Sequence, residues 1–297
     1  MATGKTGIVL EGGGMRGMYT SGILDVLMEN HIYLDGMVGV SAGIAFGCNY
    51  KSGQIGRALR YNVRFAKDSR YSGIKSLLKT GNYYNAWFAY HLVPTHYDIF
   101  DYNAFEESPM ECYAVCFDVN TGEGVYQRLD HVNDDFYEWI RASASMPIVA
   151  QPVEVGGHLL LDGGLADNIP LQFMMDKGFT RNVVILTRED SYRKTAEHAM
   201  WLMKPMLRKY PKVIEALMKR PALYNMQVQQ VREQERKGTV FVFRPSKPLD
   251  VSRTTHDPKE MNRVYQQGRE EALKRLDDLK KFLAADDEPT TPAATHE

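Results

Sequence analysis

Three features that would assign a chain to a specialised class are missing from these 297 residues. The formal net charge is only -1 and the charged residues are scattered, so there is no basic field of the kind that binds nucleic acid, and we expect no nucleic-acid partner. The first residues lack the apolar core of a secretory signal. An uncharged run at 36–50 is shorter than the ~20 residues that cross a bilayer. We therefore expect a cytoplasmic protein that does not span a membrane.

Cysteine is scarce as well. The three cysteines, Cys48, Cys112 and Cys116, cannot all pair. If Cys112 and Cys116 lie on one strand, they are ~13 Å apart along it, which is beyond the reach of a disulfide. We expect reduced and buried thiols, as in a reducing compartment.

What is present is the composition of an ordinary globular protein, with 44% hydrophobic and 25% charged residues. Short apolar strands followed by glycine turns and helices recur along the chain, which predicts an α/β fold with a mainly parallel sheet and helices on both faces. We predict one domain over residues 1–283, with the motifs in 6–175 and further strands and helices in 176–283. Residues 284–297 have the composition of a disordered tail.

The run at 36–50 contains one hydroxyl between two glycines, in Gly39-Val-Ser-Ala-Gly43. A Gly-x-Ser-x-Gly pattern is typical of a turn that leads a strand abruptly into a helix and holds the serine, here Ser41, at a strained apex. Glycine at 39 and 43 removes collisions with the neighbouring backbone. The alternative is that the small residues only let a strand and a helix pack closely.

A glycine loop follows the first apolar strand and opens a helix, in Glu11-Gly-Gly-Gly-Met-Arg-Gly17. Such a loop directs several unpaired backbone N–H groups toward one point, which suits an anion. If this turn and the Ser41 turn end adjacent parallel strands, the amides of Gly13 and Gly14 face the carbonyl oxygen that Ser41 attacks. This arrangement is an oxyanion hole.

The same loop also matches the dinucleotide fingerprint, with glycines at 12, 14 and 17. A dinucleotide site expects an acidic residue at the far end of the second strand. Asp35 precedes that strand, and Ser41 stands at its far end. Dinucleotide binding is therefore the leading alternative, but it leaves the serine unexplained.

A serine nucleophile needs a base, and Asp162 is the best placed candidate. It ends the apolar strand at 158–161 and precedes the turn Gly163-Gly164, the same kind of position as that of Ser41. Alone, Asp-Gly is a common turn signal. His198 and His256 follow the serine as a triad histidine would, but both lie in charged segments where we expect exposed side chains. We predict a two-residue Ser41/Asp162 mechanism.

Two further stretches have a marked composition. Residues 71–105 are rich in aromatic side chains, which predicts an irregular segment packed over the core, or alternatively the wall of an apolar cleft. Residues 193–220 have a helical pattern and carry eight basic residues but two acids. We predict a solvated helix pair packed on the core there, with docking on an anionic bilayer as the alternative.

Taken in order, the blocks at 11–17, 39–43 and 162–164 resemble the three signature blocks of the patatin-like phospholipases. The resemblance covers about residues 6–175, and the remainder is similar to the C-terminal extension of bacterial members. It implies a three-layer α/β fold, a Ser41 nucleophile, an Asp162 base, and an oxyanion hole formed by Gly12, Gly13, Gly14, Met15, Arg16 and Gly17. Glu11 replaces the aspartate of many members, and Asp-Gly-Gly is an accepted variant of the third block.

The resemblance implies hydrolysis of lipid or other acyl esters without a cofactor or a metal. Asp162 accepts the Ser41 proton, the alkoxide attacks the ester carbonyl, and water then releases the fatty acid. Two roles are open for Arg16, which are a structural ion pair and contact with a lipid phosphate. Peripheral contact with the inner membrane face is open too. The alternative functions are a dinucleotide-binding Rossmann-type protein and a non-catalytic, membrane-associated scaffold.

Overall fold

The computed structural model describes residues 4–196 and 200–285. The predicted tail, from residue 286 onward, and His198 lie outside these ranges. Within them the chain forms an eight-stranded sheet in the order β5-β6-β3-β2-β1-β7-β8, with β4 also paired to β3. The strands are β1 Lys5–Leu10, β2 Gly36–Val40, β3 Glu111–Asp118, β4 Gly124–Arg128, β5 Val153–Val155, β6 His158–Asp162, β7 Phe179–Ile185 and β8 Val240–Phe243.

The predicted parallel sheet is confirmed at its centre. Strands β3, β2, β1, β7 and β8 run parallel to their neighbours. At one side two hairpins, β3-β4 and β5-β6, add antiparallel strands, because β4 and β6 pair with β3 and β5 pairs with β6. The chain is therefore an α/β protein whose sheet is parallel in the middle and antiparallel at one edge.

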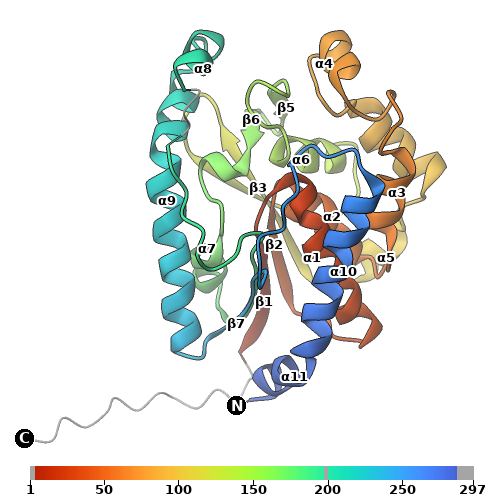
Figure 1. The fold of residues 1–297 in the computed structure, drawn as a ribbon, viewed down its shortest axis with the longest axis vertical. Coiled ribbons are helices and arrows are strands. Elements are labelled where there is room, and N and C mark those ends of the chain that lie inside the picture. Colours follow the sequence, from red (N-terminus) through yellow and green to blue (C-terminus); the bar gives the residue numbers. More distant parts are fainter. Residues whose placement is uncertain (1–3, 197–199, 286–297) are drawn as a thin grey trace, which may run out of the picture.

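Helices cover both faces of this sheet (Figure 1). The first face carries α1, α2 and α10, and the second carries α7 and α9. The helices are α1 Gly17–Glu29, α2 Ala42–Lys51, α3 Arg57–Phe65, α4 Ile74–Thr80, α5 Tyr102–Glu107, α6 Phe136–Ser143, α7 Leu171–Asp176, α8 Met200–Met206, α9 Pro211–Arg236, α10 Pro258–Lys274 and α11 Leu276–Ala284, with a π-helix at Phe88–Tyr97.

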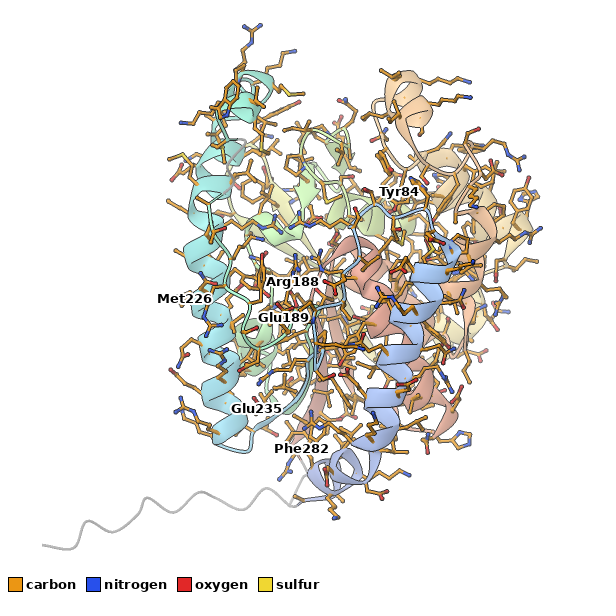
Figure 2. All side chains as sticks on the ribbon, viewed as in Figure 1. Tyr84, Arg188, Glu189, Met226, Glu235 and Phe282 are labelled. Atoms are coloured by element: carbon orange, nitrogen blue, oxygen red, sulfur yellow. The ribbon has the colours of Figure 1, made fainter. Side chains whose placement is uncertain are left out.

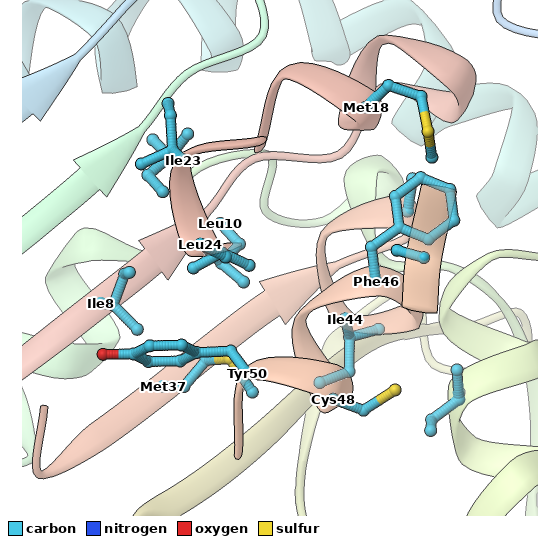
Figure 3. Close-up of a cluster of buried hydrophobic side chains, with 14 of the residues drawn as sticks. Ile8, Leu10, Met18, Ile23, Leu24, Met37, Ile44, Phe46, Cys48 and Tyr50 are labelled. Carbon is cyan, nitrogen blue, oxygen red and sulfur yellow. The ribbon is translucent and has the colours of Figure 1, made fainter. Parts of the chain in front are cut away.

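Alternate residues of the central strands pack into two separate cores. Ile8 and Leu10 of β1 join the core beneath α1 and α2, whereas Val9 joins the core beneath α7 and α9. Because successive side chains of a strand point to opposite faces, a strand covered on both sides must be apolar throughout, as β1 is. Figure 3 shows part of the first core, where strand residues meet Met18, Ile23 and Leu24 of α1 and Ile44, Phe46, Cys48 and Tyr50 of α2.

The segment at 71–105 is more regular than the sequence predicts. It contains α4, the π-helix and the start of α5, and its rings pack edge to face with one another and with Phe65 of α3. Several of these aromatic residues belong to the first core, so the predicted packed segment is confirmed. The three cysteines are free and buried, as expected.

The part after residue 176 continues the same sheet. β7 pairs with β1 and β8 pairs with β7, while α10 lies along α1. The predicted helical stretch at 193–220 contains α8 and the first part of α9. The last part of the described chain forms α10 and α11. In the described ranges, every helix is too short or too polar to cross a bilayer.

Candidate active site

The register of the sheet brings the predicted turns to one edge. Leu10 at the end of β1 pairs with Gly39 of β2, so the glycine loop and the Ser41 turn leave the sheet side by side. Val40 pairs with Val115 of β3, and the next β3 residue, Cys116, pairs with Asp162 of β6. Ser41 and Asp162 therefore stand at the same level on either side of β3.

Ser41 occupies the sharp turn that its flanking glycines predict. Its backbone has φ 56° and ψ −124°, which a non-glycine residue adopts only when the surrounding structure holds it there. A Cβ atom at Gly39 would lie 2.5 Å from the Ile44 nitrogen, and one at Gly43 would lie 2.5 Å from the Leu10 carbonyl oxygen. Only glycine fits either position, which explains the pattern.

Ser143, at the end of α6, and Ser145, two residues later, connect the Ser41 turn to β3 and to Asp162. The Ser143 hydroxyl accepts a hydrogen bond from the Ser41 backbone N–H at 2.9 Å and donates one to the Val115 carbonyl at 2.6 Å. The Asp162 N–H donates to the Ser145 carbonyl at 2.8 Å. No local sequence pattern marks Ser143, because its partners lie 28 and 102 residues away.

In the glycine loop, some backbone amides are already used. Met15 N–H donates to the Arg253 carbonyl at 3.0 Å, Arg16 N–H donates to the Gly13 carbonyl at 3.3 Å, and Gly17 N–H points to the Gly14 carbonyl. Within the described ranges, the amides of Gly12, Gly13 and Gly14 donate to no protein acceptor. Of the six residues that the sequence predicts for an oxyanion hole, Gly12, Gly13 and Gly14 are therefore the ones whose backbone N–H groups remain available.

The start of the loop is held against the end of β7 by Glu11 and Thr187. The Glu11 carboxylate accepts a 2.6 Å hydrogen bond from the Thr187 N–H, and the Thr187 hydroxyl donates to the Gly12 carbonyl at 3.1 Å. Burial raises the pKa of Glu11, an effect that the Thr187 hydrogen bond and Arg16 partly offset. Glu11 and Thr187 therefore hold the start of the glycine loop against the end of β7.

Ser41 and Asp162 border one polar cavity together with Gly12, Gly13 and Gly14. Both side chains are buried. The Asp162 carboxylate accepts a 2.8 Å hydrogen bond from the Gly164 N–H, which orients it, and Gly163 lies tightly against the Val115 carbonyl. Among the hydrogen bonds of the described residues there is none between the Ser41 hydroxyl and the Asp162 carboxylate. The two groups share a cavity without direct contact.

The polar cavity is strongly basic. Besides Glu11 and Asp162, its charged lining residues are Arg16, Arg188, Lys194, Arg220 and Arg253. Burial lowers the pKa of Arg16 to about 10, with a further contribution from the neighbouring Arg188 and Arg253. The buried Arg16 Nε has no hydrogen-bond partner among the described residues. Arg16 forms no ion pair within 4.0 Å of a described carboxylate, but Arg16 and Glu11 attract each other over a longer distance.

A second cavity meets the first at Ser41. It is lined mainly by apolar and aromatic side chains of α2, α3, α6 and the 71–97 segment, including Ala45, Phe46, Tyr61, Tyr71, Tyr84, Tyr90, Val93 and Ile140. Ser41, Gly14, Met146 and Arg253 border both cavities. Figure 2 labels one residue of each, Tyr84 of the apolar cavity and Arg188 of the polar one. The aromatic segment therefore forms a wall of an apolar cleft as well as a packed cover.

His256 is absent from the lining of both cavities. Its Nε2 lies 2.5 Å from the Tyr83 hydroxyl and its Nδ1 lies 2.8 Å from the Ala66 carbonyl oxygen. The sequence predicts an exposed side chain for His256, but the structure shows it half-buried. The loop before α10 packs against the end of α3 and against the 71–97 segment. Its contacts are those of a structural histidine.

The fold and the site define a class: an α/β protein with a buried serine at a strand-to-helix turn beside a glycine loop and an aspartate. A family model for patatin-like phospholipases matches residues 8–175, more than half of the chain. The chain belongs to this family, which favours the hydrolase interpretation of the glycine turns over the dinucleotide alternative. Residues 210–284 match a second family model, a domain of unknown function, DUF6363.

Curated relatives include lysophospholipases NTE1 from two fungi. That of Yarrowia lipolytica is 29% identical over 184 residues, which is 58% of this chain and 12% of the relative. That of Mycosarcoma maydis is 28% identical over 184 residues, which is 58% of this chain and 9% of the relative. The chain thus spans about a tenth of the length of these relatives.

Two solved structures are similar at low sequence identity. VipD from Legionella pneumophila is 15% identical with a TM-score of 0.47, over 92% of this chain and 67% of that one. A human GIVD cytosolic phospholipase A2 is 11% identical with a TM-score of 0.49, over 95% of this chain and 59% of that one.

Proposed function

We propose that the protein hydrolyses acyl esters of lipids, with Ser41 as the nucleophile and Asp162 as the general base. The observation that carries this proposal is the position of Ser41, where the apolar and the polar cavity meet. Asp162 borders the same polar cavity, and so do three glycines whose amides have no acceptor among the described residues. A nucleophile, a base and oxyanion donors thus surround one point.

In the proposed reaction, Asp162 takes the proton of the Ser41 hydroxyl as Oγ attacks the ester carbonyl carbon. The amides of Gly12, Gly13 and Gly14 stabilise the negative charge on the carbonyl oxygen, and each such donor is worth ~10²–10³ in rate. The tetrahedral intermediate collapses, and the leaving alcohol takes the proton from Asp162. Water, deprotonated by Asp162, then attacks the acyl-serine; the bond between Ser41 Oγ and the acyl carbon breaks, Oγ takes the proton back from Asp162, and the fatty acid is released.

The two cavities suggest which lipids are substrates. An acyl chain fits the apolar cavity, because burying methylene groups there gains ~0.8 kcal/mol each. The basic cavity suits an anionic head group, since arginines bind phosphate by charge-assisted hydrogen bonds. We therefore favour phospholipids or lysophospholipids over neutral glycerides, within a protein that we expect in the cytoplasm and in peripheral contact with a membrane.

Turnover of p-nitrophenyl esters tests the two catalytic roles. Ser41→Ala should remove nearly all hydrolysis, because no other group supplies the nucleophile. Asp162→Ala should lower kcat by ~10²–10⁴, the usual contribution of a general base. Unchanged melting temperatures of the two variants would exclude unfolding.

Three other results would favour the alternatives. Wild-type turnover by Ser41→Ala would overturn the proposal, and absence of turnover in all forms would favour a scaffold. Stabilisation of the protein by NAD would favour the dinucleotide alternative.

A comparison of two substrates with the same acyl chain tests the head-group preference. Arg188→Gln and Arg253→Gln should each lower the ratio of kcat/KM for a lysophospholipid to that for a monoacylglycerol by ~10-fold or more, because a hydrogen bond to a charged group is worth ~1.5–3 kcal/mol. Arg236→Gln, at the far end of α9, removes an exposed charge away from the cavities and is the control. An equal ratio in all variants would contradict phosphate recognition.

A further inference from the structure

Two short helices expose large apolar side chains to solvent. Ile74 and Leu78 of α4 are 72% and 82% exposed, and Trp201 and Met206 of α8 are 71% and 64% exposed. Leu202 of α8 is also exposed. Burial of a side chain of this size gains ~1.5–3 kcal/mol, so a cluster left in water indicates a surface that is covered in use.

Both helices lie at the same end of the molecule (Figure 1). Each protrudes beyond the carboxyl ends of β1 and β2, with α8 above α9 and α4 on the opposite side of the view. In the sequence, both helices are close to residues that line the two cavities. Asn82, Tyr83 and Tyr84, just after α4, line the apolar cavity, and Lys194 and Arg220, on either side of α8 in the sequence, line the polar one.

The charges of these protrusions have one sign. Lys75 and Lys79 lie on α4, and Lys204, Arg208 and Lys209 lie on α8 and in the turn after it. No acidic residue occurs in 71–81 or 200–212. None of the five cations forms an ion pair with a described carboxylate. Lysine and arginine beside exposed tryptophan and leucine are the residues of an interfacial helix that binds anionic lipids.

A lipid surface fits this arrangement better than a protein partner does. The apolar side chains are on two separate protrusions rather than on one continuous face. A bilayer is deformable and accepts separate insertions, whereas a protein partner needs a complementary shape. Each cation near an anionic leaflet adds ~1 kcal/mol of attraction.

We propose that α4 and α8 form a docking surface for an anionic phospholipid bilayer. Docking through both helices directs the edge of the sheet that carries Ser41 toward the membrane, so a lipid can pass from the leaflet into the two cavities. The biological role of this docking rests on the proposed function, because docking would bring the lipid substrate to Ser41. Binding to the bilayer itself requires no turnover.

Co-sedimentation with vesicles tests the docking surface. The full chain carrying Ser41→Ala, which leaves the lipids intact, is mixed with phosphatidylcholine vesicles with or without phosphatidylglycerol. We expect binding to the anionic vesicles and at least tenfold weaker binding to the neutral ones. The double substitution Leu78→Ser and Trp201→Ser should weaken binding to the anionic vesicles by ~10-fold or more.

The matched control is Met226→Ser, on the outer side of α9 and away from both protrusions (Figure 2). Met226 is 61% exposed, so its substitution removes one large exposed apolar side chain from a surface outside the proposed docking site. We expect it to change binding less than twofold. A second double variant, Lys75→Gln with Lys204→Gln, leaves the apolar residues in place and should also weaken binding to anionic vesicles, which keeps the test valid if the first variant unfolds.

Three results would overturn docking: no binding of the Ser41→Ala chain to anionic vesicles, an equal loss with Met226→Ser, or self-association without lipid that the first double variant abolishes. Hydrolysis of a short, water-soluble ester by the wild-type chain reports separately on the proposed function. A chain that hydrolyses this ester but ignores vesicles contradicts docking alone. A chain that binds vesicles but hydrolyses no ester contradicts the proposed function and leaves the surface in place.

Discussion

Ser143 connects the Ser41 turn to β3, the strand that pairs with β6 beside Asp162. Its hydroxyl bonds the Ser41 backbone on one side and the Val115 carbonyl on the other, and Cys116, next to Val115, pairs with Asp162. Because a strained backbone persists only where its surroundings hold it, this buried hydroxyl is the group expected to keep Ser41 at its apex.

Replacement of Ser143 by alanine should therefore lower activity through Ser41. It leaves a buried N–H and a buried carbonyl without their partner, and we expect kcat for a soluble ester to fall by ~10-fold or more with little change in KM. Kinetics on the purified variant measure this. Ser52→Ala is the control, since it removes another buried serine, one that bonds Asn49 and Gln54. Equal kcat in wild type and Ser143→Ala would contradict the positioning role.

At this scale, the residues that could be predicted are those with a local signature. A side chain at Gly39 or Gly43 would collide with backbone atoms a few residues away or on an adjacent strand. The turn and Ser41 can therefore be recognised from a pattern of five consecutive residues. Ser143, Thr187, Arg188 and Arg253 have no such signature. Their role depends on partners far away in the chain, and serine, threonine and arginine are common residues in any protein.

At the scale of elements, the spacing of apolar residues in α1 predicts an amphipathic helix with one face exposed to water. The contact between α1 and α10 buries that face as well. Nearly every residue of α1 is buried, because α10 covers the side that would otherwise face water. A Cβ at Gly22 would overlap the Tyr265 carbonyl, and one at Gly268 would overlap the Tyr19 carbonyl. The two backbones approach through these glycines, a long-range contact that periodicity does not reveal.

Asp25 of α1 is a buried carboxylate in this contact and gives it a pH dependence. It accepts hydrogen bonds from the Tyr265 hydroxyl at 2.6 Å and the Gly56 N–H at 2.9 Å. Burial raises the pKa of Asp25 to about 6 despite these bonds. The folded chain therefore holds this proton more tightly than the unfolded chain does, whose aspartate pKa is ~3.9. The stabilisation is complete below about pH 4 and is lost as the pH rises through about 6.

Asp25→Asn, which cannot ionise, should remove this dependence. Urea unfolding of both forms between pH 4 and pH 7 measures the free energy of unfolding. Wild type should lose about 2 kcal/mol relative to the variant across this range. Parallel profiles would show that Asp25 titrates normally in the folded protein.

At the scale of the whole molecule, one continuous sheet joins the regions matched by the two family models. β2 to β6 belong to the first region and β8 to the second, and β7, which lies between the two regions in sequence, joins β1 to β8. β7 and β8 follow the first matched region in sequence, yet β7 pairs with β1 of that region, and β8 pairs with β7 at the edge of the sheet. The backbone carbonyl of Arg253, in the second region, accepts the Met15 amide of the glycine loop. A single domain over residues 1–283 remains our prediction, and these contacts support it.

The architecture of the molecule was predictable because strand, turn and helix alternate in the sequence, and this order favours parallel strands. The meeting of the two cavities at Ser41 was not predictable from the sequence. It depends on contacts between the glycine loop and a C-terminal segment more than 200 residues away in the chain. The central claim is that this convergence makes Ser41 a nucleophile activated by Asp162.

Labelling with a fluorophosphonate probe, followed by peptide mass spectrometry, tests that claim most directly. We predict one adduct on the wild-type chain, on the peptide that contains Ser41, with no adduct on Ser41→Ala and labelling slowed ~100-fold or more on Asp162→Ala. An adduct on another serine, or labelling of Asp162→Ala at the wild-type rate, would contradict it.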